Sequence, residues 1–231
     1  MKTIGMLGGM SWESTATYYR ALNEGIKQEL GGLHSAKICM VSVDFDEIEK
    51  LQHAGDWDGA GTALANAAES IQAGGADFLI ICTNTMHKVA DHISNRIQIP
   101  ILHIADATAH ALKDNNISRV GLLGTRFTME QDFYVGRIEK THGIQVLTPE
   151  ADDRETVHRV IYDELCLGEI LSPSKAAFLG IITKLEQRGA QAIILGCTEI
   201  SMLVQNTDTA IPLYDTTAIH SASAIKMALS E

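Results

Sequence analysis

The sequence predicts an α/β protein with two pseudo-symmetric lobes, each a parallel sheet flanked by helices, and two observations support this. First, short apolar runs of strand type alternate with longer helical segments along the chain, as in parallel sheets that helices cover on both faces. Second, landmarks of the first half recur roughly 112 to 116 residues later, which indicates an internal duplication. The matched pairs are Ile4-Gly5-Met6-Leu7-Gly8-Gly9 with Val120-Gly121-Leu122-Leu123-Gly124-Thr125, Gly75-Ala76 with Gly189-Ala190, Thr83 with Cys197, and Ile99-Pro100 with Ile211-Pro212. Because ligands of such sheets bind beyond the carboxyl ends of the strands, we expect the active site in a cleft between the lobes.

Strand and helix signals place the elements of both halves. In the first half we expect strands at 3–7, 37–43, 78–82 and 99–102, and helices at 12–29, 57–73, just after Thr85 to Arg96, and 105–113, with 44–53 as a loop or short helix. Ser11 is the expected N-cap of the first helix, which Gly31-Gly32 ends. In the second half we expect strands at 120–123, 144–147, 193–195 and 211–213, and helices at 127–141, 157–166, 175–187 and 216–229. These boundaries put 1–104 in an N-terminal lobe, which 215–231 could complete, and 105–214 in a C-terminal lobe.

Composition excludes several classes of partner. The formal net charge is −11, and no basic run interrupts the acidic surplus, so nucleic acid and anionic membranes are poor partners. No apolar run reaches the ~20 residues of a membrane span, and the N-terminus lacks a signal-peptide cleavage region, so we expect a cytoplasmic protein. The four cysteines have no CxxC spacing and the histidines no HExxH pattern, which argues against disulfides and a metal site.

Cys197 is the strongest candidate for a reactive side chain. An apolar strand ends at Gly196, Cys197 follows at the turn, and Thr198-Glu199 leads into a predicted helix. Helix starts leave backbone N–H groups without intrahelical partners, and their partial positive charge favours a thiolate. The alternative is a buried core cysteine, a common fate of this residue, but the polar residues that follow disfavour it.

The matching position in the first half holds a threonine. Thr83-Asn84-Thr85-Met86-His87 follows the strand at 78–82, and its duplication partner is the Cys197 turn. Taken alone, this stretch is equally consistent with a helix N-cap. Cys82 lies one residue earlier and should point to the other side of the strand end, into the core. Cys39 and Cys166 are expected to serve packing.

Two further turns follow predicted strands. The run Gly5-Met6-Leu7-Gly8-Gly9-Met10 is not a GxGxxG fingerprint, so a dinucleotide is not expected. It fits a carboxylate-binding turn or a plain tight turn equally well. Thr125 and Thr128 follow Gly124, where their hydroxyls could bind a carboxylate or cap a helix.

The sequence resembles the cofactor-independent aspartate/glutamate racemase superfamily over essentially its whole length. The resemblance rests on Ile4-Gly5-Met6-Leu7-Gly8-Gly9-Met10, Asn84-Thr85-Met86-His87 and Gly196-Cys197-Thr198-Glu199. It implies two α/β lobes, no pyridoxal phosphate or other cofactor, a homodimer, and two cysteines that exchange a proton at the substrate α-carbon from opposite faces. One of those cysteines falls on Cys197 and the other on Thr83, as in bacterial members with a Thr/Cys pair, which implies a preference for the L-enantiomer. Single-cysteine members also include arylmalonate decarboxylases.

The resulting hypothesis is a pyridoxal-phosphate-independent racemase of aspartate or glutamate, with Cys197 and Thr83 as catalytic residues. The expected substrate-binding residues are Met10, Ser11, Gln52, Asn84, Thr85, Thr125, Thr128, Thr198 and Glu199. One alternative is a single-cysteine isomerase or decarboxylase of a dicarboxylic acid on the same fold. Another is a catalytically impaired carboxylate-binding protein. A two-lobed receptor is disfavoured by the missing export signal.

Overall fold

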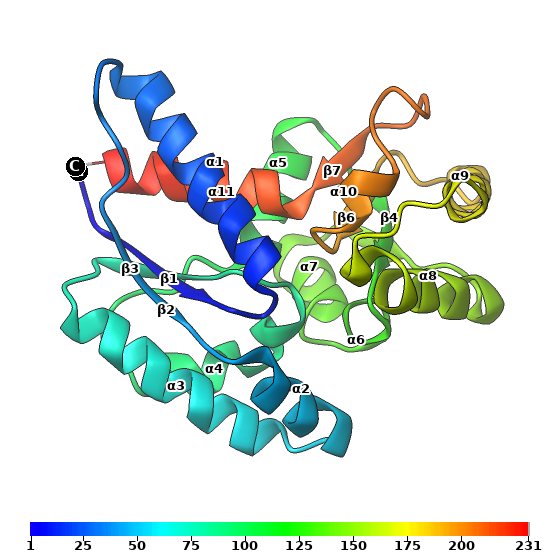
Figure 1. Ribbon diagram of the computed structural model, residues 1–231. Coiled ribbons are helices and arrows are strands. Elements are labelled where there is room, and N and C mark those ends of the chain that lie inside the picture. Colours follow the sequence, from blue (N-terminus) through cyan, green and yellow to red (C-terminus); the bar gives the residue numbers. More distant parts are fainter. Residues whose placement is uncertain (231) are drawn as a thin grey trace. The chain divides into compact units, whose positions relative to one another are not determined.

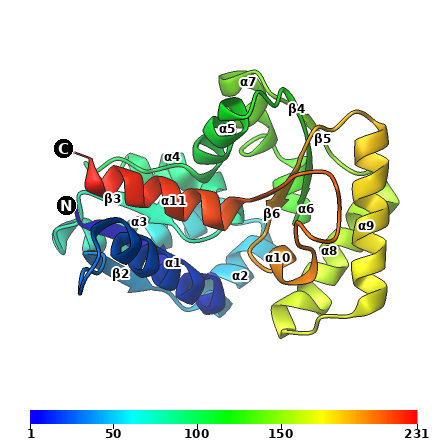
Figure 2. The same cartoon turned by 90° about the horizontal axis from the view of Figure 1, so that it is seen from above.

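The computed structural model describes residues 1–230 and divides the chain into two compact units (Figures 1 and 2). The first unit joins Met1–Ile104 to the segment that begins at His220, and the second unit is Ala105–Ile219. Glu231, the last residue of the segment expected to return to the first lobe, lies outside the described residues. None of the helices within 1–230 is long and apolar enough to cross a membrane.

The first unit is built on a parallel sheet in the order β2 (Ile38–Ser42), β1 (Ile4–Gly8), β3 (Phe78–Ile81). The strand expected at 99–102 is only a single bridge, between Leu79 and Ile101. Two hydrogen bonds hold it, from Leu79 N–H to the Pro100 carbonyl and from Leu102 N–H to the Leu79 carbonyl, each 2.9 Å.

Helices cover both faces of this sheet. Figures 1 and 2 show α1 (Trp12–Leu30) beside α11 (Thr216–Leu229) on one face, with α3 (Trp57–Ala73) and α4 (Ala90–Ser94) on the other. Strand residues alternate between the two faces, as the pleat requires. One core contains Ile4, Met6, Phe78, Ile80 and Cys82 with Tyr18, Leu22, Ala224 and Ala228. The other contains Leu7, Leu79 and Ile81 with residues of α3 and α4 that include Leu64, Ala68, Ile71 and Ile93.

This alternation confirms the prediction that Cys82 is a core residue. Its side chain is fully buried, and burial raises the pKa of the thiol far above its ordinary value. Cys82 therefore belongs to the core beneath α1 and α11, although β3 ends one residue earlier, at Ile81.

The helix ends of the first unit follow the sequence signals closely. Ser11 caps α1, with its hydroxyl accepting from Ser14 N–H at 3.2 Å, and Gly31 ends the helix at a φ of 72°. The segment at 44–53 is the helix α2 (Phe45–Ala54), capped by Asp44. The helix expected after Thr85 is instead the 3-10 helix η1 (Thr85–Val89) followed by the short α4.

The second unit repeats the sheet order of the first. Its four parallel strands run β5 (Gln145–Leu147), β4 (Arg119–Gly124), β6 (Ile193–Gly196), β7 (Leu213–Asp215). Strands β4, β5 and β6 correspond in chain order and position to β1, β2 and β3, and β7 takes the place of the bridge at Ile101. The internal duplication inferred from the landmarks is thus visible as a repeated topology.

Around this second sheet lie α5 (Ile104–Asp114, with Ile104 in the first unit), α8 (Ala151–Asp163) and α9 (Ser172–Gln187). The helix expected at 127–141 is broken into α6 (Arg126–Glu130) and α7 (Val135–His142). The break lets Met129 and Tyr134 both be buried, whereas a continuous helix would point residues five apart in different directions.

A second difference concerns the helix expected at 157–166. It ends at Asp163, and Cys166 lies in the 3-10 helix η2 (Leu165–Leu167) with its side chain exposed. The prediction that Cys166 serves packing was therefore wrong. The polar turn at Glu164 ends the helix before Cys166 can enter the core, and Glu164 instead accepts hydrogen bonds from Arg159 and Ser174.

Candidate active site

In the second unit, Cys197, Thr198 and Glu199 form the turn between β6 and the four-residue helix α10 (Ile200–Leu203). Glycine is needed at position 196, because a Cβ atom there would lie only 2.9 Å from the Leu123 carbonyl oxygen, which is too close for a side chain. All three turn residues are half-buried, so they combine protein contacts with access to solvent.

The thiol of Cys197 has a defined partner, the carboxylate of Glu199. Cys197 Sγ donates to Glu199 Oε2 at 2.9 Å. Surrounding protein atoms, and then the negative charge and hydrogen bond of Glu199, raise the pKa of the thiol well above its ordinary value. The expectation of a resting thiolate is therefore wrong. Helix α10 is too short to supply much positive potential, and burial and the carboxylate outweigh it.

The start of α11 braces this turn. Thr216 Oγ1 donates to the Leu195 carbonyl at 2.9 Å, and the hydroxyls of Thr198 and Thr217 lie 3.3 Å apart. Asp215 Oδ1 in turn accepts from Thr217 N–H at 2.8 Å. None of Asp215, Thr216 and Thr217 was among the predicted site residues. The sequence signal that could have identified them is an acidic residue followed by two threonines at the junction of a predicted strand and a predicted helix.

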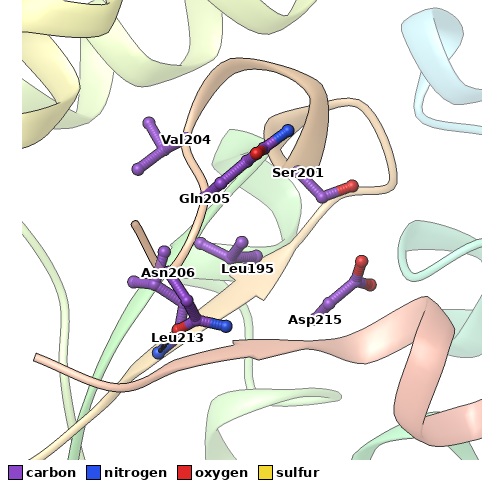
Figure 3. Close-up of a pocket in the computed structure, with 7 residues that line it drawn as sticks. All are labelled: Leu195, Ser201, Val204, Gln205, Asn206, Leu213 and Asp215. Carbon is purple, nitrogen blue, oxygen red and sulfur yellow. Dashed lines mark hydrogen bonds between the residues drawn. The ribbon is translucent and has the colours of Figure 1, made fainter. Parts of the chain in front are cut away.

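A pocket of 240 Å³ adjoins the same turn (Figure 3). Ser201 lines it and also donates to the Thr198 carbonyl at 2.9 Å. Figure 3 shows the polar ends of Ser201 and Asp215 on the same side of the pocket. The remaining lining residues are Leu195, Val204, Gln205, Asn206 and Leu213. Sequence reasoning anticipated none of the seven, because most lie beyond the motif that contains Cys197.

Thr125 and Thr128 form the neighbouring strand-to-helix turn after β4. Thr125 is the N-cap of α6, and its Oγ1 lies 3.2 Å from Thr128 Oγ1. Thr128 is fully buried, and its methyl group packs where side chains at Gly124 and Gly196 would otherwise stand. Thr125 thus acts as a helix cap, one of the two interpretations considered from the sequence, while a contact of either hydroxyl with a carboxylate stays a prediction.

In the first unit, the glycine turn after β1 is held by its own helix. Gly9 has a φ of +95°, and its N–H donates to Thr15 Oγ1 at 2.8 Å. Thr15 Oγ1 donates onward to the Ser11 carbonyl at 2.8 Å. Met10 is buried and Ser11 is half-buried. Ser14, also on α1, donates to the Cys82 carbonyl at 3.0 Å, which ties this turn to the end of β3.

Thr83 follows β3 and is half-buried, whereas Asn84, Thr85 and Met86 are buried. Gln52, expected in a loop or short helix, lies on α2 and donates to Met86 Sδ at 2.7 Å. The structure thus brings Gln52 to the segment that follows Thr83. His87, which was quoted only as the end of a motif, contacts the Thr83 carbonyl through its ring at 2.8 Å.

Thr83 and Cys197 therefore occupy equivalent places in the two units. Thr83 lies just past β3, which pairs with β1, and Cys197 lies just past β6, which pairs with β4. Within 1–230 no group of three His, Cys, Asp or Glu side chains is arranged to hold a metal ion. The groups present at these turns include the Cys197 thiol, the Glu199 carboxylate, threonine hydroxyls and backbone amides.

Comparison with known proteins identifies the family of this chain. The model of the Asp/Glu/Hydantoin racemase family matches residues 7–224, so the chain belongs to that family. Members of the racemase family are isomerases, and the chain is an isomerase of this class. Its α/β fold of parallel sheets flanked by helices is the fold of the racemase structures.

Three relatives illustrate the similarity. A Yersinia pestis protein provisionally assigned as an Asp/Glu racemase is 56% identical, with a TM-score of 0.96 and all of both chains covered. An aspartate racemase homologue from Pyrococcus horikoshii OT3 is 30% identical, with a TM-score of 0.88 and all of both chains covered. The broad specificity amino-acid racemase RacX of Bacillus subtilis is 22% identical over 188 residues, which are 81% of this chain and 75% of RacX.

Proposed function

We propose that this protein racemises aspartate or glutamate without pyridoxal phosphate, with Cys197 and Thr83 acting on opposite faces of the substrate α-carbon. The observation that carries the proposal is the equivalence of the two residues. Each follows the corresponding strand of a duplicated unit, in a chain that belongs to the racemase family. Parallel sheets bind ligands beyond the carboxyl ends of their strands, which is where both residues lie.

Carboxylate recognition follows from the groups around the two turns. Backbone amides near Asn84, Thr85 and Thr198 would hold the α-carboxylate and stabilise the ene-diolate charge that develops when the α-proton leaves. Met10, Ser11, Gln52, Thr125 and Thr128 remain proposed contacts of the rest of the substrate. The similarity to the aspartate racemase homologue from Pyrococcus horikoshii and to the amino-acid racemase RacX supports an amino-acid substrate.

Glu199 adds a step to the mechanism. Its carboxylate already accepts the Cys197 hydrogen bond, so it would receive the thiol proton and leave a thiolate. The thiolate would remove the α-proton from one enantiomer, and the electron pair of the broken C–H bond would enter the ene-diolate. The Thr83 hydroxyl, or a water that it holds, would deliver a proton to the opposite face.

This arrangement is chemically asymmetric. A hydroxyl is a much weaker base than a thiolate, so the enantiomer whose α-proton faces Cys197 should turn over faster. From the resemblance to members with a Thr/Cys pair, we propose that this is the L-enantiomer. The equilibrium between enantiomers is unaffected, because a catalyst changes barriers only. We further propose that the protein is cytoplasmic and forms a homodimer. Sedimentation velocity of the purified protein would test the homodimer.

The decisive experiment follows α-hydrogen exchange in deuterated water with each enantiomer of aspartate and glutamate. The parent should incorporate deuterium at the α-carbon as it racemises, and Cys197→Ala should abolish both. Cys39→Ala is the matched control, because this half-buried thiol lies on β2 of the other unit and should leave both rates unchanged.

Exchange by Cys197→Ala at the parental rate would refute the mechanism. If the parent neither racemises nor exchanges either amino acid, parallel assays with maleate and an aryl malonate would identify a dicarboxylic-acid isomerase or decarboxylase instead.

A further inference from the structure

His87 engages two backbone groups of the first unit with its two ring nitrogens. Its Nδ1 lies 2.8 Å from the Thr83 carbonyl oxygen, and its Nε2 accepts from Ile104 N–H at 3.2 Å. An amide N–H is only a donor and a carbonyl only an acceptor, so these partners determine the tautomer. His87 is neutral, with its hydrogen on Nδ1, and it donates that hydrogen to Thr83.

The surroundings of His87 keep it neutral and fixed. It is 2% exposed, and its ring contacts His103 and His220 edge-on, with centroids 4.5 and 5.8 Å away. His220 is likewise held, with Nε2 donating to the Leu102 carbonyl at 2.7 Å and Nδ1 accepting from Tyr18 Oη at 2.9 Å. Burial, and then the neighbouring histidines, lower the pKa of His87 well below its ordinary value.

The contact with Thr83 is one of three that fix consecutive carbonyls at the end of β3. Ser14 Oγ donates to the Cys82 carbonyl at 3.0 Å, and His87 Nδ1 donates to the Thr83 carbonyl at 2.8 Å. The backbone N–H of His87 donates to the Asn84 carbonyl at 3.1 Å. The torsions on both sides of Thr83 are therefore held from α1 and from His87. Because the Cα–Cβ direction follows from the backbone, this network also sets the direction of the bond from which the Thr83 hydroxyl projects.

We propose that His87 is a positioning residue for Thr83, which aims the threonine hydroxyl at the substrate by holding the threonine carbonyl. This inference rests on the proposed racemase function. His87 does not touch the substrate in this account. It acts through Nδ1–H alone, while the bond to Ile104 N–H serves only to keep the imidazole in the donating tautomer.

Two substitutions separate these bonds. In His87→Asn the side-chain amide can place a donor near the position of Nδ1, so the bond to Thr83 is kept and the acceptor for Ile104 is lost. In His87→Gln the longer side chain can place its oxygen near the position of Nε2, so the acceptor for Ile104 is kept and the donor to Thr83 is lost. His220→Gln is the matched control, because it alters a buried histidine of the same group that makes no bond to Thr83.

Two assays separate the faces of the reaction. Racemisation of aspartate needs both Cys197 and Thr83. Elimination from 3-chloroaspartate needs only removal of the α-proton by Cys197: the C–H electrons form a double bond, chloride leaves, and the enamine hydrolyses to oxaloacetate and ammonium. Oxaloacetate is then measured by coupled reduction. A loss of folding would lower both rates together, whereas a misplaced Thr83 would lower only racemisation.

The expected result is that His87→Gln loses roughly 10- to 100-fold in racemisation, the size of effect that a misplaced catalytic group produces, while elimination stays within about twofold. His87→Asn should keep most of the racemisation rate. His220→Gln should keep the parental ratio of racemisation to elimination. The double variant Thr83→Ala with His87→Gln should racemise no more slowly than Thr83→Ala alone. Equal racemisation by the Asn and Gln variants, or a parallel fall of both rates in His87→Gln, would overturn the proposal. A parent that neither racemises nor eliminates would instead refute the proposed function.

Discussion

The thiol of Cys197 donates to the carboxylate of Glu199 across 2.9 Å, and this contact decides how the cysteine can react. A carboxylate so close opposes ionisation of the thiol, yet it is also the nearest acceptor for the thiol proton. The resting protein therefore holds Cys197 as a thiol. The thiolate forms only when Glu199 takes its proton, which couples the reactivity of the sulfur to the charge of its neighbour.

Replacing Glu199 by Gln should therefore have opposite effects on two rates. Without the negative charge the pKa of Cys197 falls, and each unit of that fall raises the thiolate fraction about tenfold, so iodoacetamide should alkylate Cys197 faster at neutral pH. Racemisation should slow, because the proton acceptor is gone. The experiment is done in the Cys166→Ala background, so that only buried or half-buried thiols remain. Slower alkylation in the variant would show that Glu199 does not oppose ionisation.

Replacing Thr83 by Cys should restore a second thiol on the face that now has a hydroxyl. We expect the slower enantiomer to be used faster, by about tenfold or more, since a thiolate is the stronger base. Turnover of the faster enantiomer should change less. The measurement is the initial rate from each pure enantiomer by circular dichroism, and an unchanged ratio of the two rates would remove Thr83 from the proton path.

Replacing Cys82 by Ala provides the adjacent control. Cys82 is fully buried between the sheet and α1, so truncation should cost about 1 kcal/mol of unfolding free energy in urea. Racemisation should remain near the parental rate, because the side chain points away from the turn at Thr83. A loss of activity without a loss of stability would contradict the assignment of Cys82 to the core.

The sequence was sufficient to predict much of this molecule because its signals are local and repeated. Alternating strand and helix signals, the glycine turns and the duplicated landmarks predicted the α/β class, the repeated sheet and the burial of Cys82. It was insufficient where a tertiary contact outweighs a local rule. The helix start at Cys197 predicted a thiolate, but burial and the side chain of Glu199 reverse that effect.

Three further differences have the same origin. No local signal around Phe133 predicts a break in the helix. The helix is nevertheless broken there, and the break allows both Met129 and Tyr134 to be buried. Cys166 reads as helical, but the chain leaves the helix before reaching it. His87 was visible in a motif, while its role depends on Ile104, seventeen residues later, and on His220 at the far end of the chain.

We expect the buried histidines His87 and His220 to make stability depend on acid pH, and His220 offers the clearest test. Burial lowers the pKa of His220 from 6.5 to about 4, while its bond to the Leu102 carbonyl partly opposes this shift. The neutral imidazole is thus favoured in the folded state. The contribution of the neutral imidazole to the free energy of unfolding is fully present above about pH 6.5. It is lost as the pH falls towards 4, and the total loss is about 3 kcal/mol.

In His220→Gln this acid-dependent part should disappear. The variant should be less stable than the parent at pH 7, because the Tyr18 hydroxyl loses the hydrogen-bond acceptor at position 220. The difference in unfolding free energy between parent and variant should be smaller at pH 4.5. Urea unfolding at both pH values measures the difference, and His34→Gln, at an exposed site, should follow the parent throughout. The Tyr18 hydroxyl and the His87 ring face His220, and burial lowers the pKa of His87 well below its ordinary value. A gap that stays constant with pH would show that protonation of His220 does not limit acid stability.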